Sequence, residues 1–123
     1  MARKTLTKKQ KELAERFIHT GIKRPTAHVL AYTLGTEETR SKEIETATGL
    51  KQPEVSVAMS ELKEWGWVTK RDIKKEGKGR PVHGYRIDIP LKEIIKEIEE
   101  GENERINEIK ENIKAIKSLT KSM

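Results

Sequence analysis

The stretch SKEIETATGLKQPEVSVAMSELKEWGWVTK, residues 41–70, decides the fold. Its first part predicts a short helix with Ser41 as the N-cap residue and with Ile44 and Ala47 facing inward. Gly49 then closes this helix in a tight turn, because glycine adopts the left-handed backbone conformation at no steric cost. A second helix follows at once, and two helices joined by so short a turn are typical of a helix-turn-helix motif.

The second helix of this pair is predicted over residues 52–64. Pro53 suits its first turn, and Gly66 ends it. Apolar residues at positions i, i+4 and i+7 predict its buried stripe: Val55, Met59 and Leu62. The remaining positions form a polar outward face.

Two further helices are predicted before this motif. Thr7 and Gln10 form a capping-box pattern at the start of an N-terminal helix over residues 7–20. A second helix begins near Pro25 and stops at Gly35.

After the motif the apolar period changes from 3.6 to 2, which predicts a β-hairpin over residues 67–89. Its two strands are separated by a glycine-rich basic loop, residues 74–81. A helix-turn-helix followed directly by such a hairpin predicts a winged helix, in which the hairpin is the wing.

The C-terminal segment, residues 90–123, predicts a long helix with an isoleucine-rich stripe. From residue 106 onward the spacing of this stripe is heptad-like, as in coiled coils. Gly101 and Asn103 interrupt the stripe, so we expect a kink or break there. We expect a two-fold partner to cover the stripe through Ile98, Ile106, Ile109, Ile113, Ile116 and Leu119. The alternative is that the helix folds back against residues 10–18.

The predicted fold class is therefore mainly α with a small β-hairpin. We expect a winged helix-turn-helix DNA-binding domain over residues 1–89 and a coiled-coil-like dimerisation helix over residues 90–123. The chain has 123 residues, which is enough for one domain and one appendage but not for two full cores.

Charge distribution indicates the partner. Residues 1–89 carry 19 Lys and Arg against 12 Asp and Glu, whereas residues 90–123 carry 7 against 8. The basic excess thus lies entirely in the predicted winged helix, where a polyanion is the natural partner. A merely lysine-rich solvated surface is the alternative interpretation.

Composition also excludes several classes of site. The chain has no cysteine, which excludes disulfides and thiolate chemistry. Its three histidines are isolated and no nucleophile is paired with a base, so we expect neither a metal, nor another cofactor, nor an enzyme. No apolar stretch approaches the length of a membrane span, and we expect a cytoplasmic protein with no membrane partner.

The candidate DNA contacts fall on three segments. Short polar or apolar side chains on the outward face of the 52–64 helix suit base edges and thymine methyl groups in the major groove, and a lysine there suits a phosphate. The wing supplies cations for phosphates and one arginine for the minor groove. The start of the 41–48 helix offers amides and hydroxyls to a phosphate. The predicted residues are Thr39, Arg40, Ser41, Gln52, Pro53, Ser56, Val57, Ser60, Lys63, Arg71, Lys74, Lys75, Lys78 and Arg80.

Each of these segments also has a purely structural interpretation. The 52–64 face is then an ordinary solvated helix face, and Ser41 is only a cap. The wing lysines then only protect an edge strand against aggregation.

The stretch quoted first resembles the helix-turn-helix of archaeal and bacterial winged-helix regulators of the ArsR, MarR and TrmB kinds. The match rests on Gln52, Val55-Ser56, Met59, Leu62 and Gly66-Trp67-Val68, and the wing GKGRPVHGYRI is similar to the glycine- and arginine-rich wings of these families. The resemblance covers about residues 24–89 and implies a winged helix that binds DNA. The absence of cysteine departs from the metal-sensing ArsR members. An archaeal regulator with a C-terminal dimerising helix is the most similar overall picture.

We therefore expect a sequence-specific transcriptional regulator that binds double-stranded DNA as a homodimer. The alternative is a winged helix that serves as a protein-interaction module of transcription or chromosome machinery, without reading DNA sequence.

Overall fold

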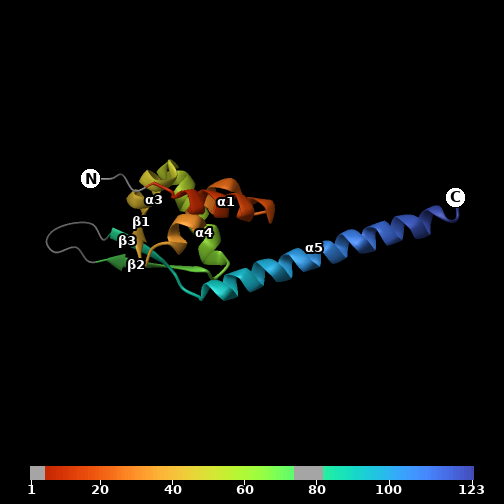
Figure 1. Cartoon of the computed structure of the whole chain (residues 1–123). Helices are drawn as coiled ribbons and strands as arrows, with labels where there is room; N and C mark the ends of the chain where they lie inside the picture. Colours follow the sequence, from red (N-terminus) through yellow and green to blue (C-terminus); the bar gives the residue numbers. More distant parts are fainter. Residues whose placement is uncertain (1–4, 74–81) are drawn as a thin grey trace. The chain divides into compact units, whose positions relative to one another are not determined.

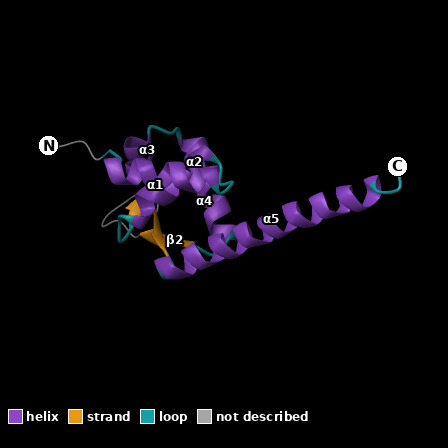
Figure 2. Ribbon diagram, turned by 45° about the vertical axis from the view of Figure 1, so that its right-hand side comes forward, coloured by secondary structure: helices purple, strands orange, loops and turns teal. Residues whose placement is uncertain are grey.

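The computed structural model describes residues 5–73 and 82–123. Its elements are α1 (Lys8–His19), α2 (Arg24–Leu34), β1 (Thr39–Arg40), α3 (Ser41–Thr48), α4 (Gln52–Glu64), β2 (Val68–Ile73), β3 (Val82–Ile87) and α5 (Leu91–Thr120). The chain divides into two units, residues 1–90 and residues 91–123. In the first unit, α1 to α4 gather together and the small sheet lies against this group (Figures 1 and 2).

Helix α1 begins with the predicted capping box. The Gln10 backbone N–H donates to the Thr7 hydroxyl over 3.1 Å, and the Gln10 side-chain oxygen accepts from the Thr7 backbone N–H over 2.8 Å. Two backbone N–H groups that a helix start leaves unpaired are satisfied in this way. Ala14 and Phe17 bury the inner face of the helix.

Helix α2 is the centre of the first unit, packed against α1, α3 and α4. Ala27, Leu30 and Ala31 are buried at helical spacing, but Val29, Tyr32 and Thr33 on other sides of the helix are buried as well. A helix surrounded by neighbours buries nearly all of its sides, so no single stripe describes it.

Within the described residues the sheet has three strands rather than the two of the predicted hairpin. Strand β1 adds two residues to the free edge of β3, and the order is β1-β3-β2 with antiparallel neighbours. Thr39 pairs with Tyr85, and Arg40 pairs with Gly84. A two-residue strand carries no periodicity, so the sequence pattern could not reveal it.

The helix-turn-helix forms as predicted, with one correction at its start. Ser41 is the first residue of α3 and not its N-cap; Arg40 occupies the cap position, and its backbone N–H donates to Glu43 Oε1 over 3.2 Å. Gly49 ends α3 in the left-handed conformation, with φ of 77°. The carboxylate of Glu43, the third residue of the helix, thus satisfies the backbone N–H of the cap residue, as it does in a capping box.

Helix α4 buries its predicted stripe, Val55, Met59 and Leu62, together with Ala58. Gly66 follows the helix with φ of 81°, and the chain then enters β2. Trp67 is buried and meets Trp65 edge to face, with ring centroids 5.1 Å apart. The tryptophan pair therefore fixes the junction between α4 and the wing.

The second unit is a single helix. The break expected at Gly101 and Asn103 is wrong, because α5 runs unbroken from Leu91 to Thr120. One glycine costs about 1 kcal/mol, which a 30-residue helix tolerates. In the part of the chain that the structure describes, no helix is both long and apolar enough to cross a membrane.

The fold is thus a winged helix-turn-helix with a long C-terminal helix, which confirms the predicted fold class.

Candidate nucleic-acid interface

The outward face of α4 is open to solvent along its length. Its exposed residues include Gln52, Pro53, Ser56, Val57, Ser60 and Lys63, the six predicted on this helix. Val57 is 60% exposed, a large value for an apolar side chain. Opposite this face lies the buried stripe, so α4 cannot rotate without losing its core contacts. The helix therefore presents a fixed row of short or flexible side chains, and an α-helix has the size that the major groove of DNA admits.

The edge of this face is anchored to α2 by Glu61. The Thr26 hydroxyl donates to Glu61 Oε1 over 2.6 Å, and Lys23 Nζ lies 3.7 Å from Glu61 Oε2. The carboxylate of Glu61 is therefore engaged by partners within the domain. A groove of about 290 Å³ runs beside it between α2 and α4, with Pro25, Val57 and Ala58 among its walls.

Residues 39–41, which lead into α3 and begin it, comprise one buried and two accessible residues. Thr39 is 1% exposed and its hydroxyl has no partner among the described residues, so its side chain is not available to a phosphate. Arg40 is exposed. Ser41 is partly exposed, and its hydroxyl lies 3.4 Å from Glu45 Oε2. Of the three predicted contacts here, Arg40 is the best placed for an anion.

The described part of the wing carries one predicted contact, Arg71. Its Nε donates to Glu38 Oε2 over 2.6 Å and its Nη2 donates to Glu38 Oε1 over 3.2 Å. The other predicted wing contacts, Lys74, Lys75, Lys78 and Arg80, lie outside the described residues.

The ion pair between Glu38 and Arg71 shifts the pKa of the Glu38 carboxyl. Hydrogen bonding to Arg71 lowers the pKa of the Glu38 carboxyl, partial burial opposes this, and the charges of Arg71, Arg86 and Arg40 add to the lowering. Because the pKa is lowered in the folded state, the pair contributes stability above the ordinary carboxyl pKa and loses it as the pH falls through the lowered value. Burial raises the pKa of the neighbouring Tyr85 phenol, which stays neutral.

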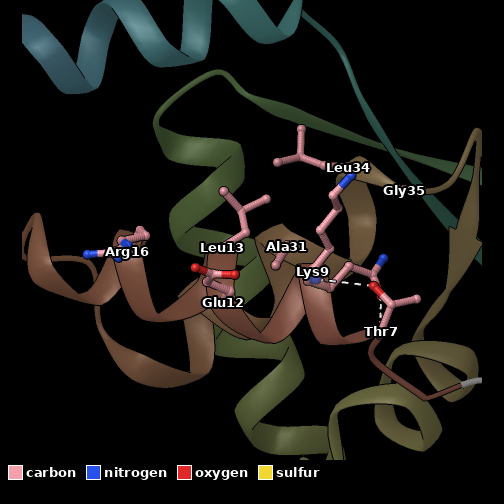
Figure 3. Close-up of a pocket in the computed structure, with 9 residues that line it drawn as sticks. Thr7, Lys9, Glu12, Leu13, Arg16, Ala31, Leu34 and Gly35 are labelled. Atoms are coloured by element: carbon pink, nitrogen blue, oxygen red, sulfur yellow. Dashed lines mark hydrogen bonds between the residues drawn. The ribbon is translucent and has the colours of Figure 1, made fainter.

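A separate hollow of about 530 Å³ lies between α1 and the end of α2. Leu13, Ala31 and Leu34 provide its apolar wall, while Lys9 and Arg16 extend from α1 around it (Figure 3). This hollow shares no lining residue with α4 or the wing, so it is distinct from the candidate DNA interface. Within the described residues, no cluster of His, Asp and Glu is suited to a metal ion.

The apolar stripe of α5 is also solvent-exposed. Ile106, Ile109, Ile113 and Ile116 are 47% to 55% exposed, Leu119 is 70% exposed, and Ile98 is partly exposed. So many large apolar side chains on one helix face are unusual on a protein surface and mark an interaction site.

Comparisons with known proteins agree with this geometry. The model of the MarR family matches residues 20–79, which contain α2, the helix-turn-helix and the first wing strand. No curated protein matches the sequence. A possible transcriptional regulator from Methanosarcina mazei Go1 superposes with a TM-score of 0.63 at 14% identity, over 86% of this chain and 84% of that one. Another structure, of a transcriptional regulator, superposes with a TM-score of 0.54 at 20% identity, over 83% of this chain and 64% of that one. Together these matches support a winged helix fold that is similar to the MarR family over residues 20–79.

Proposed function

We propose that this chain, which carries a winged helix domain of the MarR family, regulates transcription by binding double-stranded DNA as a homodimer. Helix α4 enters the major groove with Gln52 and Ser56 toward base edges and Val57 toward thymine methyl groups. Lys63 and the basic wing contact phosphates, and Arg80 reaches the minor groove.

The observation that carries this proposal is the outward face of α4. Six neighbouring side chains of this face are exposed and short or flexible, while the opposite face is buried. Base reading requires side chains that approach closely without bulk, held by a helix that does not move.

The homodimer is supported by the exposed stripe of α5. Leaving apolar surface in water costs about 25 cal/mol per Å², and a second copy offers an identical stripe. Two such domains bind half-sites about one helical turn, roughly 34 Å, apart.

The deciding experiment is selection of bound sequences from a random duplex pool by the full chain, followed by a mass measurement of the complex. We expect a pseudo-palindromic consensus held by two chains, with binding that weakens steeply as salt rises. Absence of duplex binding even at low salt would instead favour a protein-interaction module.

Single substitutions on α4 separate base reading from phosphate contact. Gln52→Ala is expected to lose about 1–3 kcal/mol on the preferred site and little on random duplex, because a base contact is removed. Lys63→Ala, the matched control on the same exposed face, is expected to weaken both duplexes equally and to reduce the salt slope by about one. Competition gel shifts with the two duplexes measure both effects, and equal losses for Gln52→Ala on both would contradict its assignment to a base.

A further inference from the structure

The outer face of the sheet gathers three arginines, one from each strand. Arg40 of β1 and Arg71 of β2 pair with Gly84 from opposite sides, and directly paired residues of antiparallel strands share a face. Arg86 is two residues beyond Gly84 on β3 and so lies on this face too. All three side chains are exposed. With strands about 4.8 Å apart, the Cα atoms of Arg40 and Arg71 are about 10 Å apart, within reach of one anion.

One carboxylate sits in this arginine cluster. Glu38, two residues before Arg40, binds Arg71 with two hydrogen bonds, and its pKa is also lowered by the charges of Arg86 and Arg40. Among the described residues, neither the Arg40 nor the Arg86 side chain has an ion pair within 4.0 Å. The four side chains therefore keep an excess of two positive charges on an open surface.

We infer that the cluster of Arg40, Arg71 and Arg86 binds a DNA phosphate, and that Glu38 occupies the phosphate's place on Arg71 when no DNA is bound. This inference rests on the proposed function. The guanidinium fork holds a carboxylate and a phosphate with the same two-bonded geometry, so one replaces the other without a change in the arginine. A phosphate that binds Arg71 through the same Nε and Nη2 donors must displace Glu38, which lowers the affinity for DNA of any sequence.

Stability and DNA binding are separable at this site. The Arg71 side chain is 66% exposed and the Glu38 side chain 25% exposed. Ion pairs that are this exposed to solvent contribute little to the free energy of folding. Glu38→Gln is therefore expected to fold, with its melting temperature checked first.

A matched control exists in the same domain. Glu15 and Arg24 form another exposed pair at 3.0 Å, away from the sheet on α1 and α2. Glu15→Gln removes the same charge and leaves one arginine unpaired, as Glu38→Gln does. A difference between the two variants then reports on position and not on net charge.

The experiment titrates a labelled random-sequence duplex by fluorescence anisotropy at several salt concentrations. We expect Glu38→Gln to bind about fivefold tighter than the parent with a similar salt slope, because the same phosphate binds Arg71 in both complexes and only the displacement of Glu38 is removed. Glu15→Gln should stay within about twofold of the parent. Adding Arg71→Ala to Glu38→Gln should remove the gain, and Arg86→Ala alone should reduce the slope by about one.

Equal affinities for Glu38→Gln and Glu15→Gln would overturn the role of Glu38, and an unchanged slope for Arg86→Ala would overturn the phosphate site. In both cases the parent still binds duplex. A parent that binds no duplex at low salt contradicts the proposed function itself, so the two failures are distinguishable.

Discussion

Replacing Ile109 with aspartate is expected to dissociate the homodimer and to weaken binding to a duplex with two half-sites by at least about a hundredfold. Ile109 is 55% exposed in the middle of the α5 stripe. Burying one isoleucine contributes about 1.5–3 kcal/mol, and the two-fold interface loses this contribution twice. The new carboxylate would also have to leave water to remain in the interface. Light scattering measures the mass, and gel shifts with one or two half-sites measure the loss.

The control is Asn107→Asp, which adds the same charge on the opposite side of α5. Residues two apart on a helix differ by about 200° in direction, so this aspartate stays in water. It should leave both mass and affinity unchanged. A dimer that survives Ile109→Asp would refute the α5 interface, whatever its effect on DNA.

Leu62→Ala is expected to lower the free energy of unfolding by about 2–5 kcal/mol, a large share of the total for a small domain. Leu62 is fully buried in the stripe that holds α4 against the core. The deletion removes apolar contacts and leaves a cavity that α4 cannot close without shifting its outward face. Urea unfolding followed by circular dichroism measures the midpoint.

Val57→Ala, on the same helix but 60% exposed, provides the comparison. It should change the free energy of unfolding by less than about 1 kcal/mol, because little burial is lost. Similar losses for both variants would show that α4 is not held by its buried stripe.

Local sequence patterns correctly predicted features whose residues all lie within one helix and its cap. The Thr7–Gln10 capping box and the buried stripe of α4 formed as predicted, because their partners lie three to seven residues apart. The same kind of argument was wrong where the competing local effects were small. At Gly101 the preference of one residue was outweighed by the rest of a long helix. At Ser41 the helix begins one residue earlier than predicted, so Arg40 and not Ser41 occupies the cap position, and the Arg40 backbone N–H donates to Glu43.

The buried and exposed faces of α4 and the apolar stripe of α5 follow from the 3.6-residue helical repeat, so the sequence alone determined them. The arginine cluster was decided by the tertiary structure. Its members belong to three strands between residues 39 and 87, and only the pairing of β1 and β2 with β3 brings them to one face. Strand pairing depends on backbone hydrogen bonds between distant segments, and a sequence carries no local signal of which residues will become neighbours in this way.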